Sequence, residues 1–133
     1  MHIEHVAIWT NDLEKLKDFY CRYFGAVANE KYSNPRKNFE SYFLGFPSGA
    51  RLEIMKMNGV PSNANDTVKH QHLGLIHIAF GAGSKEEVEN KSVELESNGF
   101  PILSGPRFTG DGYFEFETLD PDNNRIEVSW KPG

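Results

Sequence analysis

Two histidines and two glutamates occur in short segments that repeat along the chain. His5 opens H-V-A-I and His77 opens H-I-A-F, while Glu53 lies in R-L-E-I and Glu127 lies in R-I-E-V. The spacing from residue 5 to residue 77 is nearly the same as the spacing from residue 53 to residue 127. Two neutral imidazoles and two carboxylates form a doubly negative donor set, which suits Zn, Ni, Co, Mn or Fe(II). The repeat therefore predicts a divalent metal site made by these four side chains.

Each of the four residues also has an ordinary structural explanation when it is taken alone. His77 has apolar neighbours on both faces of its strand, so we expect it to be buried or at the bottom of a cleft. A buried histidine can hydrogen-bond to the backbone instead of a metal. Glu53 and Glu127 could be solvated carboxylates on amphipathic strands, and His5 could lie at the surface or in the core. The repetition of one histidine and one glutamate at equivalent positions of both halves favours the metal site over these alternatives.

The predicted strands and helices that position these residues also occur in the same order in both halves of the chain. Residues 1–10 alternate like a strand, Asn11 and Glu14 match a helix-capping pattern, and Gly25 ends the helix that follows. Strand-like runs come next at about 27–32, 38–46 and 50–57, followed by a polar loop over 58–72. The order then returns as a strand over 74–80, a helix capped by Ser84 and Glu87 and ended by Gly99, and strands at about 101–104, 112–118 and 124–130.

Length and composition limit the classes of protein to which the chain can belong. Its 133 residues indicate a single domain, 1–133, with one module at about 1–66 and the other at about 67–133. A net charge of −5 argues against a nucleic-acid partner. The sequence has no run of about 18 apolar residues that would predict a membrane span, so no membrane partner is expected. The single cysteine, Cys21, forms no intrachain disulfide and indicates a reducing, cytoplasmic location.

The chain resembles the glyoxalase I family within the vicinal oxygen chelate superfamily. The resemblance is carried by H-V-A-I-W-T-N-D-L-E-K-L-K-D-F-Y-C-R-Y-F-G at 5–25, R-L-E-I-M at 51–55, H-I-A-F at 77–80 and G-D-G-Y-F-E-F-E-T-L-D-P-D-N-N-R-I-E-V at 110–128. It implies an α+β fold in which two βαβββ modules form a curved mixed sheet around a metal. It places the metal ligands on His5, Glu53, His77 and Glu127. It also implies a homodimer with two metal sites, each chain giving one module's ligands to a site.

The resemblance favours a metal-dependent lyase or isomerase that acts on a small substrate with two neighbouring oxygens. The ion would act as a Lewis acid on these oxygens, and a glutamate would act as the base for a proton next to a carbonyl. Glu127 is the first candidate for this base and Glu53 is the second. Trp9 stands where related bacterial enzymes have an arginine that holds the carboxylate of glutathione. An aromatic ring cannot make that bidentate contact, which argues against glutathione.

Further residues are weaker candidates for contacts with the substrate. Trp9 and Tyr113 could line an apolar cavity together with Phe43 and Phe116, although a residue of each of these types more often belongs to the core. The cations considered for an anionic substrate are Arg36, Lys37 and Arg107. Arg51 and Arg125 precede the two glutamates by two residues and are expected on the same face, as partners of the ligands or as solvated side chains.

Two other functions stay open on the sequence alone. The first is another enzyme of the superfamily, such as a dioxygenase or a thiol transferase that modifies an antibiotic. The second is a non-catalytic protein that sequesters a small molecule, such as an antibiotic, in the same cleft. Metal content separates the enzymes from the sequestration protein.

Overall fold

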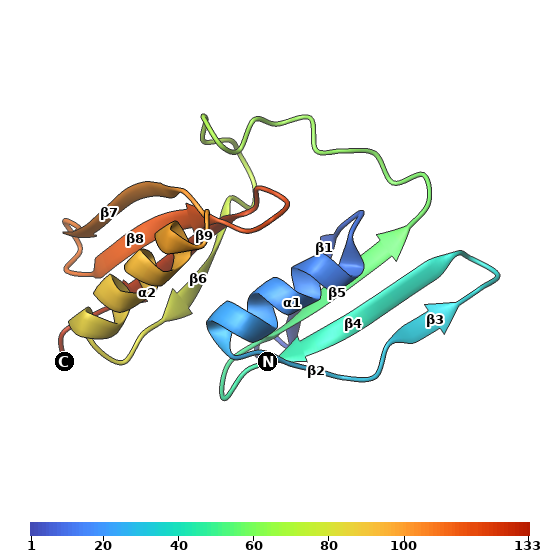
Figure 1. The fold of residues 1–133 in the computed structure, drawn as a ribbon, viewed down its shortest axis with the longest axis horizontal. Coiled ribbons are helices and arrows are strands. Elements are labelled where there is room, and N and C mark those ends of the chain that lie inside the picture. The colour runs from blue at the N-terminus through green and yellow to red at the C-terminus, as the bar shows by residue number, and fades with distance from the viewer. The chain divides into compact units, whose positions relative to one another are not determined.

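The computed structural model describes all residues 1–133 and divides the chain into two compact units. These are Met1–Ser62, hereafter the first module, and Asn63–Gly133, the second module. Each module is a strand, a helix and then further strands, as the duplicated pattern predicts (Figure 1). The elements of the first module are β1 His5–Trp9, α1 Leu13–Phe24, β2 Val27–Ala28, β3 Tyr32–Asn34, β4 Phe39–Gly45 and β5 Arg51–Met57. Those of the second are β6 His77–Gly81, α2 Lys85–Ser97, β7 Ile102–Phe108, β8 Phe114–Leu119 and β9 Arg125–Trp130.

The first module is a five-stranded mixed sheet with one face covered by α1. Its main order is β1-β5-β4-β2, and β3 pairs with β4. β1 runs parallel to β5, whereas β4 is antiparallel to β5, β2 and β3. Alternation along β5 buries Leu52 and Ile54, so that Glu53 points to the opposite face. The apolar stripe of α1 completes the core with Leu13, Leu16, Phe19, Tyr20 and Tyr23.

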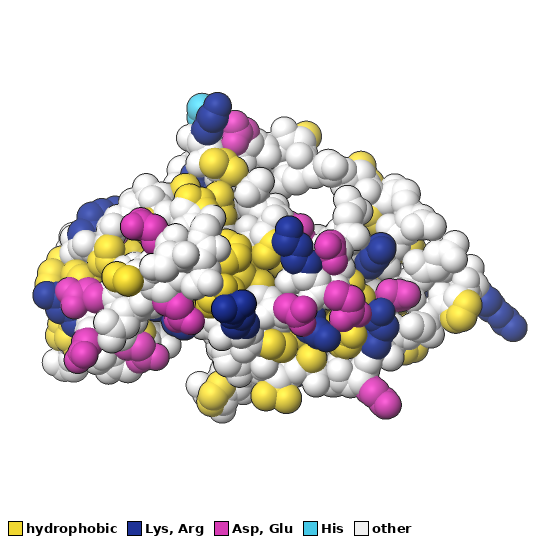
Figure 2. Space-filling model, in the orientation of Figure 1, with side chains coloured by type: hydrophobic (Ala, Val, Ile, Leu, Met, Phe, Trp, Pro, Cys, Tyr) yellow, Lys and Arg dark blue, Asp and Glu magenta, His cyan; other side chains and the backbone are white.

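The second module repeats this plan with a four-stranded mixed sheet of order β6-β9-β8-β7. β6 is parallel to β9, and β8 is antiparallel to both β9 and β7. Ile126 and Val128 of β9 are buried, and Val88 and Leu95 of α2 are buried as well. The outer face of α2 carries exposed glutamates, which are visible as an acidic area in Figure 2. The predicted fold class, α+β with two modules, is confirmed.

The helix ends show where local signals were read correctly and where they were not. Ser84 accepts a hydrogen bond from the Glu87 amide at 3.1 Å, and Glu87 reaches back to the Gly83 amide at 2.6 Å. The cap of α1 is Asp12, which accepts a hydrogen bond from the Lys15 amide. The prediction of Asn11 was therefore wrong by one residue.

Two further differences from the predicted elements concern strands. The run predicted over 27–32 is divided into β2 and β3, which pair with different parts of β4. The strand predicted over 101–104 extends to Phe108, with register shifts along its pairing with β8. Neither helix has the length and apolar composition needed to cross a lipid bilayer.

Candidate metal centre

The first module brings His5 and Glu53 together on the sheet face opposite α1. In the parallel pairing of β1 with β5, His5 lies beside Arg51, and Ala7 lies beside Glu53. His5 therefore reaches diagonally across the two strands, and its Nε2 lies 3.8 Å from Oε1 of Glu53. The Phe43 ring packs edge-on against the imidazole, with the ring centroids 5.4 Å apart. The register alone accounts for this pair, because both side chains leave the same face of adjacent strands.

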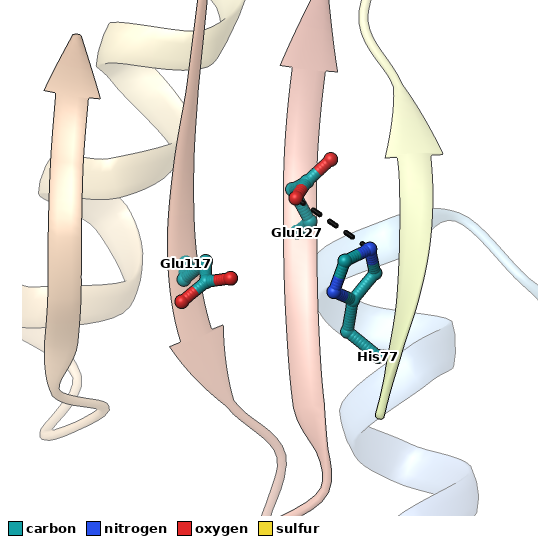
Figure 3. Close-up of side chains that lie close together, drawn as sticks. All are labelled: His77, Glu117 and Glu127. Atoms are coloured by element: carbon teal, nitrogen blue, oxygen red, sulfur yellow. Dashed lines mark ion pairs between the residues drawn. The ribbon is translucent and has the colours of Figure 1, made fainter. Parts of the chain in front are cut away.

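The second module repeats the arrangement with His77 and Glu127. His77 lies beside Arg125, and Ala79 beside Glu127, in the parallel pairing of β6 with β9. Nε2 of His77 is 3.6 Å from Oε2 of Glu127, and Figure 3 shows the imidazole and the carboxylate turned toward each other. The His77 side chain is 35% exposed, so the expectation that it is buried was wrong. Leu75, one of the apolar neighbours behind that expectation, is itself 85% exposed.

The chemistry of the two pairs fits a divalent ion. Separations of 3.6 and 3.8 Å between nitrogen and oxygen exceed those of an ordinary hydrogen bond. Two ligands at right angles around one ion, each bonded at roughly 2.1 Å, lie about 3 Å apart. An ion could therefore join the donors of either pair after a small movement of the side chains. His5 and His77 each present Nε2 to the carboxylate, which is the nitrogen that a metal would take.

Two acidic residues that the sequence reasoning missed lie beside Glu127. In the antiparallel pairing of β8 with β9, Glu117 is the direct partner of Glu127. One ligand atom from each of His77, Glu117 and Glu127 lies within 4.8 Å of the others. Glu115 leaves the same face of β8, because the residues that alternate with these glutamates, Phe114 and Phe116, are buried. This alternation in F-E-F-E is the signal that could have revealed both glutamates.

The acidic side chains of the second module perturb one another. Burial, followed by the charge of the neighbouring Glu127 carboxylate, raises the pKa of Glu115 to about 7. Burial also raises the pKa of Glu127, while a hydrogen bond with Glu115 opposes this effect. Carboxylates crowded in this way are stabilised by a proton or by a cation, which again suits a metal centre.

The two equivalent arginines differ in their surroundings. Arg125 is buried, donates to Glu117 at 3.1 Å, and also binds the backbone oxygens of Thr67 and Val68. Arg51 is 43% exposed, pairs with Glu4, and lies with its guanidinium 4.2 Å from the Phe43 ring centroid. Arg125 thus contacts a residue of the candidate centre, while the ion pair of Arg51 is made outside it.

The predicted substrate residues are spread over both modules. Trp9 shares the face of His5, is 42% exposed, and packs edge-on against Phe39 at 6.0 Å. Arg36 and Lys37 are exposed in the turn before β4. This turn lies at the far end of the sheet from His5, and the distance between the two ends along the strands is roughly 20 Å. The structure therefore does not bring these two cations to the His5–Glu53 pair.

The remaining candidates belong to the second module. Arg107 is the partner of Glu115 in the pairing of β7 with β8. Tyr113 is half-buried and lies under the amino group of Lys131, which is 4.9 Å from the ring centroid. Phe116 is fully buried and belongs to the core, not to a cavity.

Comparisons with known proteins agree with this architecture. The profile of the Glyoxalase/Bleomycin resistance protein/Dioxygenase superfamily matches residues 2–128. The uncharacterized protein YwkD of Bacillus subtilis (strain 168) is 31% identical over 131 residues, covering 95% of this chain and 94% of that protein.

Two solved structures are similar over nearly the whole chain. The trypanothione-dependent glyoxalase I of Leishmania major is 26% identical, with a TM-score of 0.75, covering 96% of this chain and 85% of that one. A glyoxalase family protein from Enterococcus faecalis is also 26% identical, with a TM-score of 0.74 and coverage of 96% and 95%. The chain therefore belongs to the glyoxalase/bleomycin resistance protein/dioxygenase superfamily.

Proposed function

We propose that this protein is a divalent-metal-dependent, glyoxalase-like lyase or isomerase. Its substrate is a small molecule with two neighbouring oxygens. The observation that carries the proposal is the duplicated pair, in which an imidazole Nε2 lies 3.8 Å or 3.6 Å from a glutamate oxygen in equivalent strands. Membership of a superfamily that includes glyoxalases supports it.

The residues proposed to hold the ion are His5, Glu53, His77 and Glu127. When bound, a divalent ion supplies Lewis acidity, which polarises a carbonyl and makes the adjacent carbon–hydrogen bond more acidic. We propose that the protein is a homodimer with two such centres. Each centre takes one pair from the first module and one from the second.

A glutamate of the centre moves the proton in this scheme. Glu127 is the leading candidate, because it lies on a central strand of its sheet with His77 on one side and Glu117 on the other. Its carboxylate takes the proton from the carbon next to the carbonyl and returns it to the neighbouring carbon. Glu53 is the second candidate, since its position in the first module is equivalent.

The first module supplies a surface for the rest of the substrate. Trp9 lies two residues beyond Ala7, the partner of Glu53, and therefore roughly 7 Å along the strand from the proposed ligand. Phe43 and Met55 lie on the same face of the sheet. This surface suits an apolar group on the carbons that carry the two oxygens, and Trp9 itself cannot make a bidentate contact with a carboxylate of glutathione.

The test combines metal analysis with a substrate panel. We expect about one divalent ion per chain by elemental analysis. We also expect turnover of at least one adduct of a 2-oxoaldehyde with a thiol. Loss of the hemithioacetal absorbance measures this turnover. Comparing the turnover of the phenylglyoxal adduct of glutathione with that of an uncharged thiol shows which class of thiol the protein accepts.

Variants identify the base and provide the control. Glu127→Gln and Glu53→Gln should each weaken metal binding, and Glu127→Gln should abolish turnover even when it is saturated with metal. Glu40→Gln changes a glutamate on the opposite face of β4 and should behave as wild type. Full turnover in both site variants, or a protein with no affinity for metal, would reject the proposal. Oxygen consumption with iron would instead indicate a dioxygenase.

A further inference from the structure

The two modules differ in the residue that lies beside the glutamate of each histidine–glutamate pair. The strand partner of Glu53 is Phe43, whereas the strand partner of Glu127 is Glu117. Glu117 therefore occupies in the second module the place that an aromatic ring occupies in the first. The first module offers an ion one imidazole and one carboxylate, and the second module offers a further carboxylate.

The geometry of the second module suits three ligands to one ion. His77, Glu127 and Glu117 project from the adjacent strands β6, β9 and β8 on the same side of the sheet (Figure 3). One donor atom of each lies within 4.8 Å of the others. Two ligands on opposite sides of an ion, with bonds of roughly 2.1 Å, are about 4.2 Å apart. Only one pair among three ligands can be opposite, and ligands at right angles lie about 3 Å apart, so side-chain shifts of up to about 1 Å would bring all three within bonding distance.

Arg125 holds the third carboxylate in position. Its Nη1 donates to Oε2 of Glu117 at 3.1 Å, and further hydrogen bonds to Thr67 and Val68 fix the guanidinium itself. The Glu117 side chain is only 19% exposed, so few other orientations are open to it. The Oε1 atom is left to meet a cation. Arg125 is thus a positioning residue for this carboxylate.

We propose that the second module anchors the metal ion through His77, Glu117 and Glu127, and that the first module completes the coordination more weakly with His5 and Glu53. This inference rests on the metal dependence proposed above and adds Glu117 as a ligand. It makes the duplicated centre unequal, with three donors on one side and two on the other.

The test is calorimetric titration of the full-length, metal-free protein with NiCl₂. Glu117→Gln keeps an oxygen for Arg125 but removes the charge, and we expect Ni²⁺ affinity to fall at least ~10-fold. His77→Ala should bind Ni²⁺ more weakly than any of the other variants. The double variant His5→Ala/Glu53→Gln should still bind one ion per chain, at lower affinity. Thermal melting in EDTA checks that each variant is folded, and Glu40→Gln serves as the control on another strand face.

The outcomes separate this inference from the proposed function. Wild-type affinity in Glu117→Gln would overturn the anchoring role of Glu117 and leave the four-ligand centre intact. A first-module double variant that binds Ni²⁺ as weakly as His77→Ala does would also overturn it. A wild-type protein that binds no Ni²⁺ or Zn²⁺ would refute both proposals. A Phe43→Glu variant gives the reciprocal test, because a carboxylate added beside Glu53 should tighten binding.

Discussion

Replacement of the buried arginine of the second module tests how much its contacts stabilise the fold. In Arg125→Met, methionine retains most of the apolar stem but removes the bonds to Glu117, Thr67 and Val68. The Arg125 side chain is 7% exposed and that of Glu117 is 19% exposed. Breaking a buried ion pair costs about 3–5 kcal/mol when the remaining charge cannot reach water. Glu117 keeps some access to water, so we expect a loss of about 3 kcal/mol.

The first module provides the matched control, since Arg51 is the equivalent residue and is exposed. Arg51→Met should change stability little, because exposed ion pairs contribute little. Each module has one tryptophan, Trp9 or Trp130. Urea unfolding of metal-free protein can thus be followed by Trp130 fluorescence in a Trp9→Phe background, and by Trp9 fluorescence in a Trp130→Phe background. The structural reasoning would be refuted if the two arginine variants lost equal free energy of unfolding, or if Arg125→Met were as stable as its parent.

Two further changes test the backbone and the charges of the fold. Gly105 has φ +80°, and a Cβ there would lie 2.4 Å from the Glu115 carbonyl oxygen, whereas at Gly112, with φ +89°, the nearest atom is 3.8 Å away. Gly105→Ala should therefore cost about 3 kcal/mol and Gly112→Ala about 1 kcal/mol in urea unfolding, and similar losses would contradict the close contact. Hydrogen bonds with Lys31 and Tyr42 lower the pKa of Glu14 to about 2. Since this pKa is depressed in the fold, the stabilisation is present above about pH 4.5 and is lost as pH falls toward 2. Glu14→Gln should thus be less stable than wild type at pH 6 and equally stable near pH 2, and a gap that widens in acid would contradict this assignment.

The duplicated order of elements was predictable because both copies carry the same local signals. Ser84 and Glu87 cap α2 as expected, and Gly25 ends α1 with φ +68°. The cap of α1 was misplaced because Asn11 and Asp12 are adjacent and both suit the position. The choice follows from contacts absent from the sequence pattern, since the Thr10 hydroxyl accepts a hydrogen bond from the Asp12 amide.

The candidate centre was predictable in its pairs but not in its neighbours. His5 with Glu53, and His77 with Glu127, follow from the repeat and from strand alternation. Alternation in F-E-F-E indicates the face of Glu115 and Glu117, but which of them lies beside Glu127 follows only from the register of β8 against β9. The exposure of His77 also depended on how its apolar neighbours pack, which their residue types do not determine.

The most direct test of the central claim is the number of imidazoles bound to the ion. X-ray absorption spectra of the Ni²⁺- or Co²⁺-loaded protein report the histidine ligands. We predict two imidazoles in the wild-type protein and one in both His5→Ala and His77→Ala, measured at metal concentrations that load each variant. A wild-type spectrum with no imidazole, or one that neither substitution changes, would contradict a centre shared by the two histidine–glutamate pairs.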